Sequence, residues 1–303
     1  MAAAPASRVA VRRSPLEARG TAEELIDVVR RQSAKLSGGQ RKVVEFFVSH
    51  CDQAVFLTSL QVAHEAGVSE ATVVRTARAL GFAGYPQFRT AFRSYFVERM
   101  STVTRVRLTA SPRRSVGDII DVVMDSDRKN LEATRMRLDD KALGRAAEMI
   151  GSARMVYILG MRSAYGLAWL LHFSLRLIRV PAQIITLGAS DVTEQLEAVG
   201  EGDIVFGMTF ERYTRATVEL FAACVGKGAR GIALTDKPTS PLAALAEVVL
   251  EAPTRLSSFI DSFVAPTAII NVLLTLIAAK RRRKVLRALE QREHDWRRSR
   301  TYL

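Results

Sequence analysis

The stretch GVSEATVVRTARALGFAGYPQFR occupies residues 67–89 and decides how the N-terminal part of the chain folds. It follows a short helical pattern and starts with Gly67, which is suited to the left-handed turn that ends a helix. Ser69 then provides a side chain that caps helix N-termini. Apolar residues recur behind it at helical spacing, whereas Arg75 and Arg78 lie off that stripe. The pattern predicts two helices joined by a tight turn.

The second of these helices is predicted to carry short and basic side chains on its outer face. Short side chains near its start allow close approach to base edges, and arginines supply contacts with guanine or phosphate. The alternative is a plain helical hairpin with a solvated face. The candidate DNA-contacting residues are Ser59, Gln61, Ser69, Glu70, Ala71, Thr72, Arg75, Thr76, Arg78, Tyr85 and Arg89.

The surrounding sequence is helical from residue 21 to residue 100. One helix is predicted to start at Thr21, where Glu24 completes a capping-box pattern, and another to start at Ser37. Residues 21–100 are therefore predicted to form an all-α helix-turn-helix domain. Residues 1–20 are predicted to be a disordered tail, and residues 101–114, which lack a clear period, to be a linker.

From residue 154 onward, short apolar runs alternate with helical patterns. The runs are RMVYIL, QIITL, DIVFGM, RGIALT and EVVLE, and the helical patterns cover residues 165–179, 192–198, 215–227 and 241–246. Strands that are apolar on both faces and alternate with helices predict a parallel sheet covered on both sides. Residues 115–280 are therefore predicted to form a three-layer α/β domain with a five-stranded parallel sheet, followed by a basic C-terminal helix or tail at residues 281–303.

The stretch at residues 67–89 closely resembles the N-terminal domain of the RpiR/MurR family of bacterial transcription regulators. In that family, a Gly-Val-Ser-x-Ala-Thr-Val-x-Arg run is followed by Leu-Gly-Phe and Gly-Tyr-Pro. The matching residues here are Gly67, Val68, Ser69, Ala71, Thr72, Val73, Arg75, Leu80, Gly81, Phe82, Gly84, Tyr85 and Pro86. The resemblance implies sequence-specific binding of double-stranded DNA, and a C-terminal sugar isomerase-like (SIS) domain that senses phosphorylated sugars.

Two loops of the predicted α/β domain supply candidate ligand-binding residues at the ends of strands, where ligands of such domains lie. Hydroxyl groups and backbone N–H groups in such loops are suited to phosphate. The residues are Gly160, Arg162 and Ser163 in the first loop, and Thr209, Arg212, Tyr213 and Thr214 in the second.

Both loops depart from the family's phosphate-binding pattern, which is Gly-x-Gly-x-Ser in the first and Ser-x-Ser-Gly-x-Thr in the second. Aligned without gaps, Arg162 stands at the second glycine and Ala164 at the serine, while Phe210, Glu211 and Arg212 replace the later Ser-Gly pair. Bulky side chains are expected to narrow a phosphate cradle, but guanidinium groups also hold carboxylates or phosphates through two hydrogen bonds. The predicted effector is a sugar phosphate, a sugar acid or another organic anion. The alternative is that the two arginines form structural ion pairs.

The charge of the chain is concentrated at its ends. The 303 residues have a formal net charge of +13. Residues 1–100 hold 14 Lys or Arg against 9 Asp or Glu, and residues 280–303 hold 10 against 3. Basic ends are consistent with an anionic partner such as DNA. The C-terminal run is either a solvated helix or a second nucleic-acid contact.

Other features set limits on cofactors and location. Two cysteines, Cys51 and Cys224, are too few for a disulfide framework and lack metal-site spacing. The N-terminus shows no secretory signal pattern. The apolar run at residues 263–279 is close to the lower limit for a membrane span of about 30 Å, but it contains Pro266 and Asn271, and a buried core helix explains it equally well. We predict a cytoplasmic protein that has no metal, no cofactor and no membrane contact.

These observations predict a transcription regulator that is not an enzyme and that forms a homodimer or homotetramer through its SIS domain. The first alternative is a sugar-phosphate isomerase, which needs a positioned base. The one histidine of residues 115–280, His172, lies in an apolar helix and is more typical of a core residue. The second alternative is a DNA-binding protein whose α/β domain only dimerises.

Overall fold

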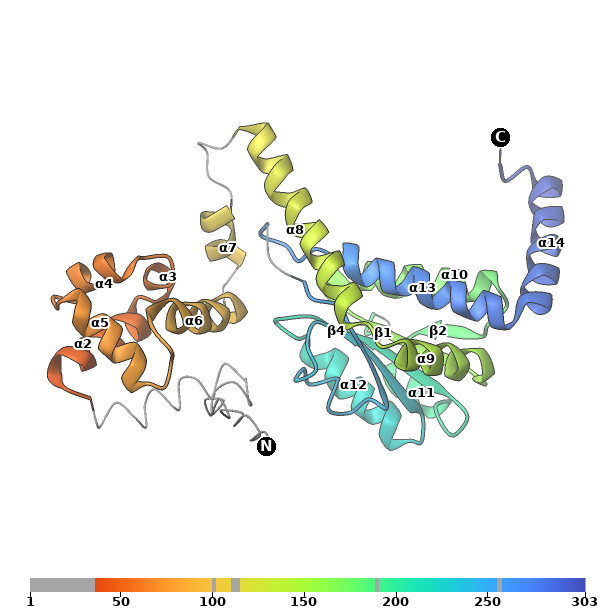
Figure 1. The fold of residues 1–303 in the computed structure, drawn as a ribbon. Coiled ribbons are helices and arrows are strands. Elements are labelled where there is room, and N and C mark those ends of the chain that lie inside the picture. Colours follow the sequence, from red (N-terminus) through yellow and green to blue (C-terminus); the bar gives the residue numbers. More distant parts are fainter. Residues whose placement is uncertain (1–35, 100–101, 110–114, 189–190, 255–257, 303) are drawn as a thin grey trace, which may run out of the picture. The chain divides into compact units, whose positions relative to one another are not determined.

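The chain divides into two compact units, Met1–Thr104 and Arg105–Leu303, each of which is described by itself. The computed structural model describes residues 36–99, 102–109, 115–188, 191–254 and 258–302 (Figure 1). The predicted tail and the predicted helix that starts at Thr21 fall outside the described residues up to residue 35.

The described part of the first unit is all-α, as predicted. Its described helices are α2 (Gly38–Ser49), α3 (Cys51–Ala54), α4 (Ser59–Glu65), α5 (Glu70–Ala79) and α6 (Tyr85–Arg99). The rings of Phe47, Phe88 and Phe92 form the centre of its core, with centroids 4.7 to 5.1 Å apart. The stability of this small unit therefore depends on aromatic packing between α2 and α6, against which α4 and α5 are arranged.

The second unit contains the predicted five-stranded parallel sheet. Its strands are β1 (Val156–Gly160), β2 (Ala182–Ile184), β3 (Ile204–Met208), β4 (Arg230–Thr235) and β5 (Val248–Glu251), in the order β2-β1-β3-β4-β5. All pairings are parallel. The chain order reverses between β1 and β3, and in open α/β sheets such a switch point is where a crevice for ligands opens at the carboxyl ends of the strands.

Helices cover both faces of the sheet and complete three layers (Figure 1). Ile158 and Phe206 point into a core shared with α9 (Asp140–Ser152), α10 (Tyr165–Leu177) and α13 (Val264–Lys280). Leu159 and Val205 point the other way, into a core shared with α11 (Val192–Glu197) and α12 (Arg215–Gly226). The alternation along each strand confirms the three-layer prediction.

Two segments differ from the sequence-based expectation. Helix α7 (Thr102–Thr109) forms within the predicted linker, and the side chain of Arg105, only 5% exposed, forms an ion pair of 3.0 Å with Asp261. This tertiary contact leaves no trace in apolar periodicity. The predicted helix at residues 241–246 is instead a series of turns after Ser240, whose hydroxyl accepts a hydrogen bond from the N–H of Ala243.

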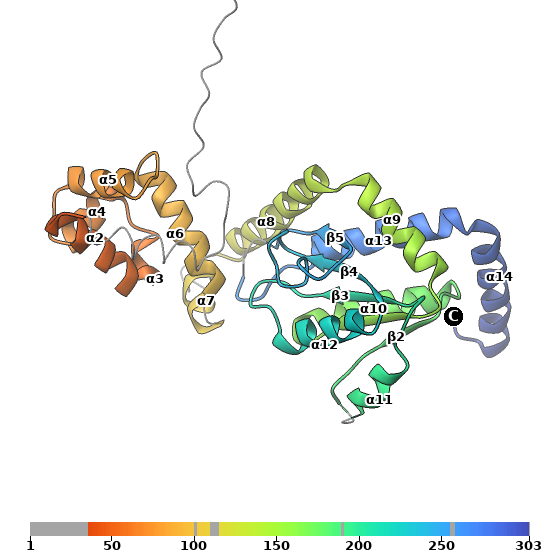
Figure 2. The same ribbon diagram turned by 90° about the horizontal axis from the view of Figure 1, so that it is seen from below.

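The C-terminal part of the chain consists of two helices that meet at a sharp bend. Helix α13 buries six residues in the sheet core: Ala265, Pro266, Ile269, Ile270, Leu273 and Ile277. Helix α14 (Arg282–Ser299) turns away from it by 104° (Figure 2). Among the described residues, no single helix has both the length and the apolar character of a membrane span; only α13 and α14 taken together pass that test.

Candidate functional site

The turn between α4 and α5 has the geometry that the sequence predicted. Gly67 has a φ of +62°, and the N–H of Val68 donates to the carbonyl of Ala63 at 2.9 Å, which closes the end of α4. The hydroxyl of Ser69 then accepts a hydrogen bond from the N–H of Thr72 at 3.2 Å and caps α5. The direction of α5 relative to α4 is therefore set by local hydrogen bonds.

The outer face of α5 is accessible to solvent. Glu70, Ala71, Arg75 and Arg78 are exposed, and Thr72 is half-buried. One guanidinium nitrogen of Arg75, Nη2, donates to the hydroxyl of Thr72 at 3.1 Å, which leaves its other donors pointing to solvent. This surface is short and polar at the start of the helix and basic further along, a composition that suits a DNA groove.

Two of the predicted DNA contacts are buried, which disfavours direct contact with DNA. Thr76 has no exposed surface, because it lies three residues after Val73 and next to Ala77 on the buried stripe; its hydroxyl donates to the carbonyl of Thr72 at 2.7 Å. Tyr85 is 5% exposed, and its hydroxyl donates to the carbonyl of Leu57 at 2.7 Å. Burial raises the pKa of this phenol to about 12.

Three further candidates hold the helices together. The side chain of Gln61 accepts hydrogen bonds from the N–H and hydroxyl of Thr58 in a capping box at the start of α4. The hydroxyl of Ser59 donates to a carboxylate oxygen of Glu70 at 2.6 Å and so joins the start of α4 to the start of α5. Arg89 is half-buried, and its guanidinium donates to the carbonyl of Leu57 at 3.4 Å.

The second candidate region lies at the switch point of the sheet. Gly160 ends β1 opposite Met208, which ends β3, so the two predicted ligand loops leave adjacent strands side by side. A Cβ atom at Gly160 would lie 2.8 Å from the carbonyl oxygen of Ala164 and 3.0 Å from the Cβ of Ala168. Gly160 is therefore required for the close approach of the following helix to the strand.

The first loop continues into a short 3₁₀ helix, η1 (Arg162–Ala164). Arg162 has a φ of +56°, and both it and Ser163 are exposed. Ala164, at the position of the family's serine, is buried. The first loop thus presents a guanidinium and one hydroxyl, from positions that differ from the family pattern.

The second loop has the same backbone feature. Arg212 has a φ of +64° and is exposed. Thr209 is buried, and its hydroxyl accepts a hydrogen bond from the N–H of Thr214 at 3.1 Å, while its carbonyl accepts one from the hydroxyl of Thr235 at 2.8 Å. These bonds fix the shape of the loop between β3 and α12.

The polar side chains around the second loop are paired with each other. Glu211 forms an ion pair with Lys237 at 3.2 Å, and the hydroxyl of Tyr213 donates to Asp236 at 3.0 Å. Burial raises the pKa of the Asp236 carboxyl, and the hydrogen bond from Tyr213 partly offsets this rise. Phe210, expected to narrow the cradle, is 5% exposed and packs on Phe263 with ring centroids 5.3 Å apart.

In each of the two loops, an arginine adopts a backbone conformation that is typical of glycine. The phosphate-binding pattern of the RpiR/MurR family has glycine at the positions of Arg162 and Arg212. Both arginines adopt the left-handed conformation. That conformation costs a residue with a Cβ about 1–2 kcal/mol. Strained residues of this kind concentrate at ligand sites, where the surrounding structure holds them in place. Among the described residues, no cluster of three His, Cys, Asp or Glu could hold a metal ion.

Comparison with known families agrees with this division of the chain. The helix-turn-helix domain of the rpiR family matches residues 23–99, and the SIS domain matches residues 149–276. The HTH-type transcriptional regulator HexR of Escherichia coli is 26% identical over 263 residues, which cover 85% of this chain and 89% of HexR.

Two solved structures share the fold. The sugar isomerase domain of an RpiR transcription factor from Sphaerobacter thermophilus is 30% identical, with a TM-score of 0.55; the match covers 58% of this chain and 97% of that domain. The Vibrio vulnificus NanR protein, solved in complex with ManNAc-6P, is 21% identical with a TM-score of 0.55, and the match covers 90% of this chain and 97% of NanR.

Proposed function

The chain belongs to the RpiR family of helix-turn-helix transcription regulators, and we propose that it reads its operator with α5 and adjusts operator binding to an anionic carbohydrate derivative. The observation that carries the DNA-binding part is the exposed face of α5. Ser69 caps this helix, and the first turn carries short side chains. Arg75 and Arg78 follow further along the helix and face solvent. In helix-turn-helix proteins this part of the second helix enters the major groove.

The proposed interface with DNA is narrower than the sequence suggested. Ser69, Glu70, Ala71, Thr72, Arg75 and Arg78 form the reading surface. Ser59 and Gln61 orient the start of α4, and Thr76 and Tyr85 belong to the core. Substitutions in the second group should change the stability of the unit more than its choice of DNA sequence.

The proposed effector site is formed by the two loops at the switch point of the sheet. Arg162 and Arg212 follow adjacent strand ends and are both exposed. Guanidinium groups bind carboxylates and phosphates through paired hydrogen bonds, and they retain their charge at all physiological pH values. A sugar phosphate, a sugar acid or a sugar acid phosphate fits this chemistry. The relative NanR was solved with a sugar phosphate, which supports the same ligand class here.

Within the second unit, the second loop packs close to the segment that contacts α7. Phe210 of the second loop packs on Phe263, two residues after Asp261. Asp261 holds Arg105 on α7, the helix that begins at Thr102 in the first unit. A ligand that moved the second loop would therefore act on the segment that anchors α7. Such a ligand shifts operator affinity only if it binds more tightly to one conformation of this segment than to another, and if the two conformations differ in affinity for the operator.

The proposal assigns no catalytic role to the second unit. The named relatives reported above are transcription regulators. His172 is half-buried on α10, and its pKa is lowered by burial and by the nearby charge of Arg176. Incubation of the purified protein with sugar phosphates checks this assignment, and isomerisation at a rate above the protein-free control would contradict it.

Operator selection tests the DNA-binding part. Full-length protein is used to select duplexes from a random pool, and the enriched sequence is then bound at equilibrium. We expect one enriched motif. If the protein forms a dimer, its half-sites should be related by a two-fold axis and centred about 34–36 Å, or a multiple of that, apart. A pool that shows no enrichment would contradict the proposal.

A further inference from the structure

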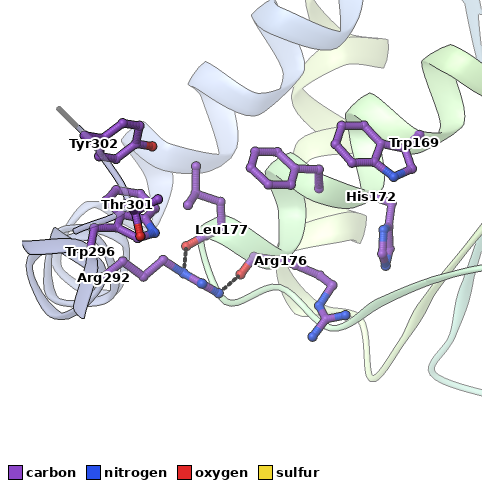
Figure 3. Close-up of a pocket in the computed structure, with 9 residues that line it drawn as sticks. Trp169, His172, Arg176, Leu177, Arg292, Trp296, Thr301 and Tyr302 are labelled. Atoms are coloured by element: carbon purple, nitrogen blue, oxygen red, sulfur yellow. Dashed lines mark hydrogen bonds between the residues drawn. The ribbon is translucent and has the colours of Figure 1, made fainter. Parts of the chain in front are cut away.

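A cavity that shares no lining residue with the two candidate ligand loops lies between α10 and the C-terminal segment. Its volume is about 390 Å³, which is within the usual range of small-molecule sites. Figure 3 shows side chains of α10 on one side and those of α14 and the following tail on the other. The lining residues are Trp169, His172, Phe173, Arg176, Leu177, Arg292, Trp296, Thr301 and Tyr302.

The two sides of the cavity are aromatic. On α10, the rings of Trp169 and Phe173 stack with an interplanar angle of 9° and centroids 5.3 Å apart. On the other side, Trp296 and Tyr302 meet edge to face at 5.4 Å. Trp169 is 52% exposed and Phe173 is 50% exposed, so a large aromatic surface faces the cavity and solvent. Aromatic surfaces of this kind attract a further planar ring.

The charge of the cavity is positive. Arg292 joins its two sides: Nε donates to the carbonyl of Leu177 at 3.0 Å, and Nη2 donates to that of Arg176 at 2.7 Å (Figure 3). The guanidinium of Arg176 forms no hydrogen bond or ion pair with any residue that the structure describes. Its positive charge lowers the pKa of the nearby His172, after the larger effect of burial. The nine lining residues include no carboxylate, so the cavity favours an anion over a cation.

We propose that this cavity binds a small planar aromatic anion, such as an aromatic carboxylate. The ring would lie between the aromatic sides of the cavity, and the carboxylate would accept hydrogen bonds from Arg176. The site is separate from the loops after β1 and β3, and it does not depend on the proposed function of those loops. A cavity of this volume is within the range of small-molecule sites.

The chain provides its own reporter for this site. It contains two tryptophans, Trp169 and Trp296, and both line the cavity. Tryptophan fluorescence of the full-length protein therefore reports on the cavity alone. Three probes separate the contributions: benzoate has the ring and the charge, benzamide has the ring without the charge, and acetate has the charge without the ring.

We expect benzoate to change the tryptophan emission in a saturable way, benzamide to bind at least tenfold more weakly, and acetate to have no effect. Arg176→Gln should weaken benzoate binding at least tenfold and leave benzamide binding unchanged. Arg298→Gln, an exposed arginine on α14 outside the lining, is the matched control and should behave as wild type.

Three results would overturn the inference. The first is equal affinity for benzoate and benzamide, the second is full benzoate affinity in Arg176→Gln, and the third is the absence of saturation. A change of emission with protein concentration and without any probe would instead assign the surface to a second copy of the chain. Operator binding is not measured in these experiments, so their failure would leave the proposed regulatory function untouched.

Discussion

At the residue scale, four arginines among the described residues of the second unit, Arg162, Arg179, Arg212 and Arg300, have a backbone conformation that glycine adopts without strain, and two of them lie in the candidate ligand loops. Arg162 and Arg212 have φ values of +56° and +64°. Each follows a strand that ends at the switch point of the sheet. Both loops therefore combine a backbone conformation typical of glycine with a long, cationic side chain. The shape and the charge of these loops can therefore be tested separately.

The backbone strain at Arg162 predicts an order of stabilities. In Arg162→Gly, relief of the left-handed strain is offset by the greater entropy of the unfolded chain, so the free energy of unfolding should stay within about 1 kcal/mol of wild type. Arg162→Val should lower the free energy of unfolding more than Arg162→Gly does, because the left-handed region strongly disfavours a β-branched side chain. Thermal unfolding measures the order, and equal midpoints for the two variants would show that the position is not left-handed.

Arg75 provides the corresponding test on α5. Arg75→Ala should weaken operator binding by about 1–3 kcal/mol, because a base-reading arginine loses its hydrogen bonds. The midpoint of thermal unfolding should not change, since the side chain is exposed. Fluorescence anisotropy with the operator and with a scrambled duplex separates sequence-specific binding from non-specific affinity for DNA. Wild-type affinity for the operator in this variant would remove α5 from the interface.

The sequence was informative about single residues where local geometry decides their role. Gly67 and Ser69 were correctly placed at the turn and at the cap because both roles depend on neighbours in the chain. Thr76 and Tyr85 were expected to face outward, but both are buried. Each hydroxyl can be buried because it donates to a backbone carbonyl, that of Thr72 for Thr76 and that of Leu57 for Tyr85. The bond from Tyr85 joins residues 28 apart in the chain, so the sequence alone does not show it.

At the element scale, the contact between β1 and the start of α10 positions the first loop. Gly160→Ala should lower the unfolding midpoint, with a cost of about 1–3 kcal/mol from overpacking, because the new methyl would press on the backbone of Ala164. Gly144→Ala is the matched control, since a Cβ there meets no atom within 4 Å; it should raise stability by about 0.5–1 kcal/mol. Equal effects of the two changes would contradict the described packing.

The strands and most helices could be predicted from periodicity, but two segments could not. All five apolar runs became strands, and the central strands β1 and β3 are buried on both faces, which explains why they are apolar throughout. Helix α7 was missed because its sequence lacks an apolar period; its ion pair between Arg105 and Asp261 is not visible in the sequence. The turns after Ser240 were taken for a helix because apolar residues such as Leu242 and Ala246 pack in the core at a spacing that a short helix also shows.

At the scale of the whole molecule, basic residues gather at both ends of a chain whose centre is nearly neutral. The net charge of +13 predicts that operator affinity falls steeply as salt rises, because each phosphate contact releases bound counterions. The slope of log affinity against log salt should be about −0.9 for each contact. A chain that ends at residue 280 should keep most of this slope if only the N-terminal unit binds DNA. A flat dependence in the full chain would argue against an interface of many phosphate contacts.

The central claim is that an anion bound at Arg162 and Arg212 changes operator affinity. Its direct test is an operator titration by anisotropy with glucose 6-phosphate, gluconate and 6-phosphogluconate, and with glucose as the uncharged control. We expect at least one anion to change the dissociation constant of the wild type and glucose to leave it unchanged. Arg212→Ala should lose that response while its affinity without ligand stays at the wild-type value. An anion response that persists undiminished in Arg212→Ala would contradict the account, and so would a wild type that responds to none of the three anions.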